Sequence, residues 1–263
     1  MTQILTASNV GKSYGSGAGR LQIIDGLTLS IAKGEFVSLV GPSGCGKTTL
    51  LMCLSGLLTV SAGDVVFNGR NMTAPPIGLS VVFQDYSRSL LPWKTNLANV
   101  LFGMRRLSDM ADAAKRARAH EILAAVGLGG FADHYPWQLS GGMQQRVAIA
   151  RGIASQSELL LLDEPLAAVD AQTRADMQDL LLDLARRFNQ TCMLVTHDVE
   201  EAVYMADRVL VLGPRPTRVV REILVDLPKP RDQITTREDP AFLAARHEVM
   251  SLIRTMRQGQ KLS

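Results

Sequence analysis

A glycine-rich stretch around residue 45 has the composition of a phosphate-binding loop. It reads Gly41-Pro42-Ser43-Gly44-Cys45-Gly46-Lys47-Thr48, followed by Thr49, and fits the pattern G-x-x-x-x-G-K-[ST]. Glycines let the backbone fold so that successive N–H groups point inward around an anion. We expect Lys47 to reach the β- and γ-phosphates of a nucleotide and Thr48 to ligate Mg²⁺. The stretch therefore predicts a nucleotide-binding loop rather than an ordinary turn.

Two adjacent carboxylates follow an apolar run later in the chain. Leu159–Leu162 precede Asp163 and Glu164. A buried strand would carry Asp163 to the Mg²⁺ side of the phosphates, and Glu164 would lie where a carboxylate can polarise an attacking water. Taken alone, the pair could simply be two solvated acids at a strand end. Together with a phosphate loop, it predicts nucleotide hydrolysis.

A third stretch combines a hydroxyl with two glycines at a helix start. It reads Leu139-Ser140-Gly141-Gly142-Met143-Gln144-Gln145-Arg146. A serine hydroxyl and glycine N–H groups at a helix start can bind an anion, although such a start is more often a simple cap. The stretch resembles the LSGGQ-type signature of ABC-family ATPases, with Met143 replacing the glutamine.

The resemblance covers residues 1–225 and implies a fold. That fold is α/β, with a P-loop NTPase (RecA-like) core, an N-terminal antiparallel β subdomain and an inserted α-helical subdomain. It also implies ATP and Mg²⁺ as the bound groups. Two copies would meet head-to-tail, with Ser140, Gly141 and Gly142 facing the γ-phosphate bound to the opposite subunit.

Single residues match other family motifs. Tyr14 resembles the aromatic residue that stacks on adenine, and Gln84 resembles the glutamine that touches Mg²⁺ and senses the membrane partner. Asp170, in Ala168-Val169-Asp170, looks like the aspartate that couples the two sites, and His197 looks like the histidine that contacts the γ-phosphate. The implied catalytic residues are Lys47, Gln84, Glu164 and His197, and the implied metal ligands are Thr48, Gln84 and Asp163.

Three further segments look like those of nitrate, sulfonate and taurine importers. They are Phe83–Trp93, Gly213–Pro216 and Leu227–Asp232. In such importers the apolar part, Leu90-Leu91-Pro92-Trp93, docks a coupling helix of the membrane subunit; the alternative is a hydrophobic cluster that caps a helix.

The importer resemblance implies partners and a location. A second copy, a multi-span membrane permease and, indirectly, a periplasmic or lipid-anchored solute-binding protein are the implied partners. The chain would lie peripherally on the cytoplasmic face of the plasma membrane. The alternatives are a soluble ABC ATPase in cofactor assembly or nucleic-acid work, and a regulatory ABC subunit.

Composition is consistent with these expectations. The chain has 263 residues, 28 Lys and Arg against 25 Asp and Glu, and 46% hydrophobic residues. The even charge balance argues against a nucleic-acid binder, and no apolar run approaches the roughly 20 residues of a membrane helix. Three cysteines form no closed disulfide framework, and the first residues lack a secretory pattern, so we expect a cytosolic protein.

The order of elements predicts a parallel sheet covered on both faces, because short apolar runs alternate with helical patterns. We expect an ABC ATPase domain over residues 1–226, a helical subdomain at about 89–154, and a tail over 227–263. An apolar stripe of Phe242, Val249, Ile253 and Met256 predicts an amphipathic helix in that tail. The expected strands are 4–10, 21–31, 36–40, 65–67, 79–83, 159–162, 193–196 and 209–212.

Cys45 lies inside the phosphate loop, at a helix start that tends to lower a thiol pKa. Alkylation of Cys45 would then block ATPase activity, and bound MgATP would protect it. The alternative is an inert small residue shielded by nucleotide.

Overall fold

The computed structural model describes residues 2–85, 89–167 and 169–260 and divides the chain into two compact units. The first unit comprises Met1–Pro76 and Thr191–Ser263, and the second comprises Ile77–Gln190. The helical block expected at about 89–154 lies inside the second unit. Tyr86, Ser87 and Arg88 of the importer-like segment, and Ala168 beside Asp170, lie outside the described residues.

An antiparallel sheet opens the first unit, as predicted. Its strands occur in the order β2-β1-β4-β5. Ala7 pairs with Leu29 on one side and with Val65 on the other, and all three side chains are buried. The strands are β1 (Gln3–Tyr14), β2 (Leu21–Ala32), β4 (Ala62–Phe67) and β5 (Arg70–Asn71), and a short 3-10 turn η1 (Gly17–Gly19) joins the first two.

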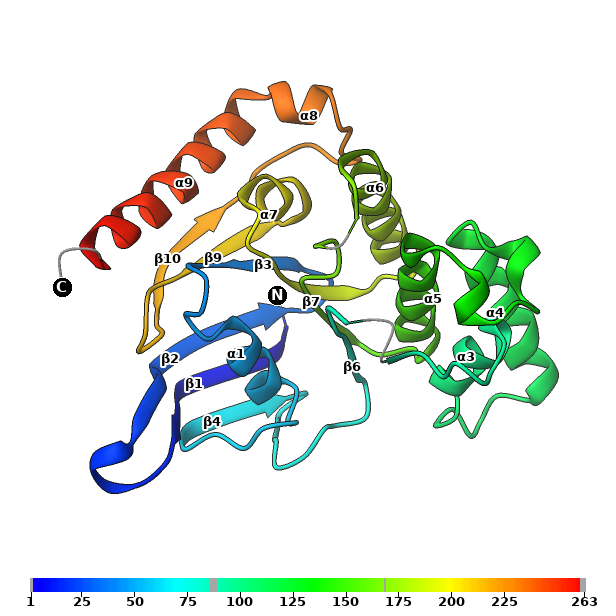
Figure 1. Ribbon diagram of the computed structural model, residues 1–263, viewed down its shortest axis with the longest axis horizontal. Coiled ribbons are helices and arrows are strands. Elements are labelled where there is room, and N and C mark those ends of the chain that lie inside the picture. Colours follow the sequence, from blue (N-terminus) through cyan, green and yellow to red (C-terminus); the bar gives the residue numbers. More distant parts are fainter. Residues whose placement is uncertain (1, 86–88, 168, 261–263) are drawn as a thin grey trace. The chain divides into compact units, whose positions relative to one another are not determined.

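A mixed sheet with the order β10-β9-β3-β8 completes the first unit. Its strands are β3 (Phe36–Val40), β8 (Thr191–Val195), β9 (Arg208–Leu212) and β10 (Val219–Leu224). β3 is parallel to both β8 and β9, and every residue of β3 and β8 is buried. Helix α1 (Lys47–Leu54) packs against β8, and α7 (Val199–Met205) packs against β3 and β9 (Figure 1).

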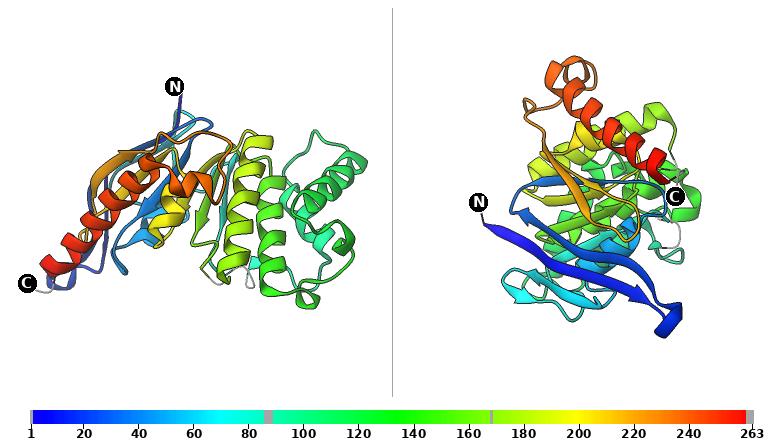
Figure 2. Two further views of the ribbon diagram at one scale, coloured as in Figure 1. Left: turned by 90° about the horizontal axis from the view of Figure 1, so that it is seen from above. Right: turned by 90° about the vertical axis from the view of Figure 1, so that its left-hand side faces the viewer.

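The chain beyond Leu227 folds into α8 (Thr235–Glu238) and α9 (Pro240–Gln260). Phe242 and Val249 of the apolar stripe are buried. Helix α9 packs against α7, β9 and β10, and it follows the sheet edge in the views of Figures 1 and 2. The tail therefore belongs to the core of the first unit.

Arg231 fastens this tail to the C-terminal end of α7. Its side chain is only 2% exposed, and its guanidinium donates to the carbonyl oxygens of Tyr204 and, at 2.7 Å, Ala206. A cation at the last carbonyls of a helix also complements the helix dipole. Next to it, the Asp232 carboxylate accepts from the backbone N–H groups of residues 234 and 235 and so opens α8.

The second unit contains a parallel strand pair and a group of helices that contact one another. β6 (Leu79–Val82) runs parallel to β7 (Leu159–Asp163), and α5 (Gly141–Ala154) packs against β6. Helices α3 (Asn96–Gly103), α4 (Asp112–Ala125) and α5 contact one another (Figure 1). The remaining described elements of this unit are η2 (Gly129–Phe131), η3 (Pro136–Gln138) and α6 (Ala171–Arg187). Within the described residues, no helix combines the length and apolar character that a membrane-spanning segment requires.

All three cysteines are buried, and their thiols are not part of a disulfide bond. Burial raises the pKa of Cys45 and Cys53, and it raises the pKa of Cys192 to about 12. Lys47 lowers the pKa of Cys45, but the effect of burial is larger. The expectation of a lowered Cys45 pKa is therefore wrong, because the thiol itself is buried although the loop around it is partly exposed.

We predict that the thiols of the native chain react slowly with iodoacetamide at pH 8. A raised pKa leaves less thiolate at a given pH, and each pKa unit costs about tenfold in thiolate. Mass spectrometry of the alkylated fraction over time should show a lower rate at each cysteine than in the urea-unfolded chain, and at least a roughly tenfold lower rate at Cys192. Equal rates in the two states would contradict this prediction.

Replacing Arg231 should destabilise the first unit. Arg231→Ala removes charged donors from two buried carbonyls, and we expect a loss of about 2–4 kcal/mol in the free energy of unfolding. The matched control is Arg218→Ala, which removes a mostly exposed ion pair with Asp25 and should cost at most about 1 kcal/mol. Urea denaturation followed by circular dichroism measures both, and similar losses would contradict the special role of Arg231.

Candidate functional site

The phosphate loop connects β3 to α1, as the sequence predicts. At two of its glycines a Cβ atom would clash with a neighbouring side chain. Gly46 has a φ of 115°, and a Cβ there would lie 2.7 Å from Ile23 Cγ2. A Cβ on Gly41 would lie 2.9 Å from the Cβ of Leu212. The loop conformation is therefore specified by contacts with β2 and β9 as well as by its own sequence.

The ammonium group of Lys47 is held inside the loop. The residue is 7% exposed, and Nζ donates to the carbonyl oxygens of Gly41 at 3.1 Å and Pro42 at 3.3 Å. These bonds compensate for burial of the charge, which would otherwise be costly. By contrast, Ser43, Gly44 and Thr48 are exposed, and Thr49 is half-buried. The loop thus has a buried cation beneath an accessible polar rim.

His197 follows the strand next to the one that enters the phosphate loop. β8 ends at Val195, which pairs with Leu39 of β3, and the N–H of Thr196 donates to the Leu39 carbonyl at 3.1 Å. Thr196 is buried, whereas the side chain of His197 is exposed. Parallel strands end at one sheet edge, so the first unit brings His197 and the phosphate loop to the same edge.

Tyr14 ends β1 with a substantially exposed ring. The ammonium of Lys12 lies 5.3 Å from the ring centroid. A cation near an aromatic face is stabilised by the ring quadrupole. The exposed ring can stack on a flat ligand, as the family resemblance implies.

Asp163 and Glu164 end β7 in the second unit. Asp163 is buried, and Glu164 is half-buried. Glu164 has a φ of 45°, in the left-handed region that costs a residue with a side chain roughly 1–2 kcal/mol. Such strained residues concentrate at functional sites. The sequence predicts the two carboxylates but carries no signal for this backbone conformation.

The serine of the signature stretch is the N-cap of α5. The Oγ atom of Ser140 accepts from the N–H of Met143 at 3.4 Å, and both Ser140 and Gly141 are exposed. A Cβ on Gly142 would lie 3.5 Å from the Thr173 side chain in α6. The second unit therefore brings the signature stretch close to the start of α6.

Asp170 is the N-cap of α6. Its carboxylate accepts from the N–H of Thr173 at 3.0 Å and from the Thr173 hydroxyl at 2.7 Å. These hydrogen bonds hold the pKa of the Asp170 carboxyl below its usual value. The sequence predicts a coupling role for Asp170, and the capping role is an additional finding.

Gln84 is exposed just after β6. The apolar segment that follows is divided between the interior and the surface, since Leu90 is buried and Trp93 is 71% exposed. Trp137, before the signature stretch, is 69% exposed, and its ring stacks on Tyr135 with centroids 5.9 Å apart. The helix-capping alternative accounts for Leu90 but leaves the exposure of Trp93 unexplained.

Two polar side chains that the sequence did not single out hold this segment in place: Asn99 is buried and Arg151 is half-buried. Asn99 bonds to the N–H and the carbonyl of Leu91 and to two further carbonyls at 94 and 95. Arg151 donates to the carbonyl oxygen of Ser89 at 2.6 Å and to its hydroxyl at 3.0 Å. Asn99 could have been predicted from its position, because an asparagine inside an apolar helix usually forms hydrogen bonds with nearby backbone groups.

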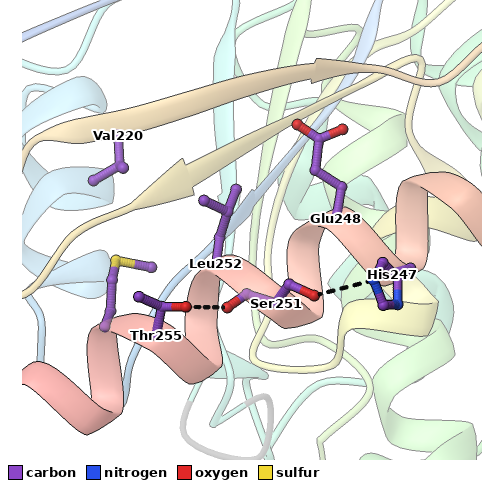
Figure 3. Close-up of a pocket in the computed structure, with 7 residues that line it drawn as sticks. Val220, His247, Glu248, Ser251, Leu252 and Thr255 are labelled. Carbon is purple, nitrogen blue, oxygen red and sulfur yellow. Dashed lines mark hydrogen bonds between the residues drawn. The ribbon is translucent and has the colours of Figure 1, made fainter.

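A pocket of about 500 Å³ lies between β10 and α9 (Figure 3). Ser251 and His247, 3.5 Å apart, line it together with Glu248. Its lining contains none of the residues predicted for nucleotide chemistry.

Several proteins resemble this chain along nearly its whole length. An uncharacterized ABC transporter ATP-binding protein of Methanocaldococcus jannaschii is 42% identical, over 95% of this chain and 91% of that protein. The nitrate import ATP-binding protein NrtC of Synechococcus elongatus is 41% identical, over 93% of this chain and 37% of that protein. The bicarbonate transport ATP-binding protein CmpC of the same species is 40% identical, over 100% of this chain and 40% of that protein. The chain thus spans less than half the length of the last two.

Solved structures confirm the predicted fold class. The ATP-binding cassette MJ0796, a dimer in a post-hydrolysis state with ADP and phosphate, has a TM-score of 0.73 and 34% identity, covering 84% of this chain and 98% of that one. The cbiO1 protein of Clostridium perfringens, part of the transporter complex cbiONQ, has a TM-score of 0.75 and 25% identity, covering 84% of this chain and 88% of that one. Both likenesses agree with a P-loop NTPase architecture.

The sequence profile described as ABC transporter matches residues 24–167. This range contains the phosphate loop, the signature stretch and the carboxylate pair Asp163 and Glu164. The match extends over more than half of the chain, and full-length relatives exceed 40% identity. The chain therefore belongs to the ABC transporter family and is an ATP-binding subunit that hydrolyses ATP.

Proposed function

We propose that this chain energises an importer for a small anion or organic solute of the nitrate, sulfonate or taurine class. The observation that carries the proposal is the 41% identity to a nitrate import ATP-binding protein along 93% of the chain. The similarity to a bicarbonate transport ATP-binding protein also favours a small oxyanion as cargo.

The proposed nucleotide contacts are made by residues of the first unit. The ring of Tyr14 stacks on adenine, and the backbone of residues 41–49 surrounds the phosphates. Lys47 neutralises charge on the β- and γ-phosphates, since its ammonium already lies within the loop. This placement supports ATP as the bound nucleotide.

The proposed metal ligands are chemically suited to Mg²⁺. Thr48, Gln84 and Asp163 offer a hydroxyl, an amide and a carboxylate oxygen, and Mg²⁺ prefers oxygen ligands with few carboxylates when phosphates complete its shell. When bound, the ion neutralises charge on the phosphate oxygens.

Hydrolysis requires a water molecule to attack the γ-phosphorus while the bond to the bridging oxygen of ADP breaks. Glu164 orients this water and accepts its proton. Lys47 and His197 stabilise the charge that develops on the γ-phosphoryl oxygens. Ser140, Gly141 and Gly142 of a second copy complete the site, and Asp170 couples the two sites of the dimer.

We propose three protein partners for this chain. A second copy binds head-to-tail, and the dimeric state of the MJ0796 cassette supports a dimer. Multi-span permease subunits bind the exposed side of the segment that contains Trp93, and a periplasmic or lipid-anchored solute-binding protein delivers the cargo. The chain then lies at the cytoplasmic face of the plasma membrane, and nucleic acid has no part in this function.

Replacing the proposed general base tests the chemical step. We expect Glu164→Gln to lower kcat for ATP hydrolysis by about 10²–10⁴, because the amide cannot accept the proton. ATP binding should remain within about twofold, since uniform binding does not depend on the general base. Phosphate release and equilibrium nucleotide binding measure the two effects.

The matched control for this experiment is Glu158→Gln, an exposed carboxylate at the opposite end of β7. It should leave kcat unchanged. Near-normal hydrolysis by Glu164→Gln would remove Glu164 from the proposed role.

The importer proposal predicts a membrane partner. A tagged chain purified from detergent-solubilised membranes of its native host should bring down a multi-span membrane protein. A strain that carries only Glu164→Gln should fail to grow on at least one of nitrate, taurine and an alkanesulfonate, each supplied as the sole nitrogen or sulfur source. The wild-type gene should restore that growth. Recovery of the chain without a membrane protein, and normal growth on all three solutes, would support a soluble ABC ATPase instead.

A further inference from the structure

The helix that follows His197 is held by the C-terminal tail. α7 begins at Val199, so Glu200 lies in its first turn, three residues after His197. The Glu200 carboxylate accepts from Arg237 of α8 through Oε2 and from Arg246 of α9 through Oε1, both at 2.9 Å. Each oxygen of one carboxylate therefore binds a different tail arginine.

The tail also contacts the other end of α7. Arg231 binds the carbonyl oxygens of Tyr204 and Ala206, and the guanidinium of Arg237 lies 5.0 Å from the centroid of the Tyr204 ring. Tyr204 is fully buried. The tail thus fixes α7 from its first turn to its last.

The first turn of α7 in turn determines where His197 lies. Asp198 accepts from the N–H groups of Glu200 and Glu201 at 2.9 and 3.1 Å. On the other side of the histidine, the Thr196 hydroxyl donates to the buried Glu201 carboxylate and accepts from the N–H of Asp198 at 3.1 Å. Both chain neighbours of His197 are therefore bound to the first turn of α7.

We propose that Arg237 and Arg246 are positioning residues for ATP hydrolysis, which act through Glu200 and the first turn of α7 on His197. This proposal rests on the proposed role of His197 at the γ-phosphate. It gives the tail a function in the reaction cycle, because a shift of the tail relative to α7 changes the position of His197. A displacement of about one ångström can cost about a hundredfold in rate, so even a small shift matters.

The ion pairs of Glu200 with Arg237 and Arg246 are suited to positioning His197 because they add little to the free energy of unfolding. The side chain of Glu200 is 45% exposed, and ion pairs of this exposure contribute weakly to the free energy of unfolding. Their removal should therefore leave the fold intact while it loosens the first turn of α7. This separates an effect on His197 from unfolding.

The experiment uses the full-length chain and single-turnover hydrolysis with enzyme in excess over MgATP. The variants are Glu200→Gln and the double variant Arg237→Gln/Arg246→Gln. We expect each to lower the single-turnover rate roughly tenfold, which is less than the loss for a full ångström of misplacement. The dissociation constant for MgATP, measured by equilibrium binding, should change less than twofold. The conservative double variant Arg237→Lys/Arg246→Lys should retain most of the rate, since it keeps both charges.

Two further variants make the result specific. Glu248→Gln removes the tail ion pair with Arg221, which joins α9 to β10 rather than to α7, and it should hydrolyse ATP at the wild-type rate. In a His197→Ala background, Glu200→Gln should have no further effect, because the group that it positions is absent.

Each outcome decides between the proposals. A normal rate for Glu200→Gln beside an impaired His197→Ala overturns the positioning inference and leaves the proposed function intact. A tenfold loss that persists in the His197→Ala background, or an equal loss for Glu248→Gln, overturns it as well. Full hydrolysis by His197→Ala removes the proposed role of His197, and the inference fails with it.

Discussion

The complete burial of β3 between two parallel neighbours is the constraint on which the nucleotide site depends. Phe36–Val40 has no exposed position, and its pairing with β8 and β9 fixes the edge at which all three strands end. The phosphate loop leaves β3 at this edge, and the segment that contains His197 leaves β8 there. A slip in this register would separate the two, so the geometry of the site is a property of the sheet.

Much of this architecture could be predicted from the sequence because parallel, doubly covered strands are continuous apolar runs. β3, β7, β8 and β9 were predicted within two residues on this basis. β10 was missed because it lies at a sheet edge, and only Ile223 of its six residues is buried. Its pattern is therefore neither apolar throughout nor alternating, and only its pairing with β9 identifies it.

For the site, the sequence predicted residue types but not their environments. The left-handed backbone of Glu164 and the burial of Cys45 arise from the packing around them. Neither can be predicted from the residues adjacent in sequence. The same holds for the tail, since Glu200 meets its arginine partners 37 and 46 residues later in the chain. Both contacts exist only once α8 and α9 have packed onto α7, and no periodicity encodes them.

The placement of the two tryptophans gives the chain an intrinsic optical probe. Trp93 and Trp137 are its only tryptophans, and both indoles lie on the surface of the second unit. Indole emission therefore originates from that unit alone, at the long wavelengths typical of a water-exposed ring, with ready quenching by acrylamide. Anything that covers this surface would shift the emission to shorter wavelengths, so unlabelled protein can report binding to that face in a fluorimeter.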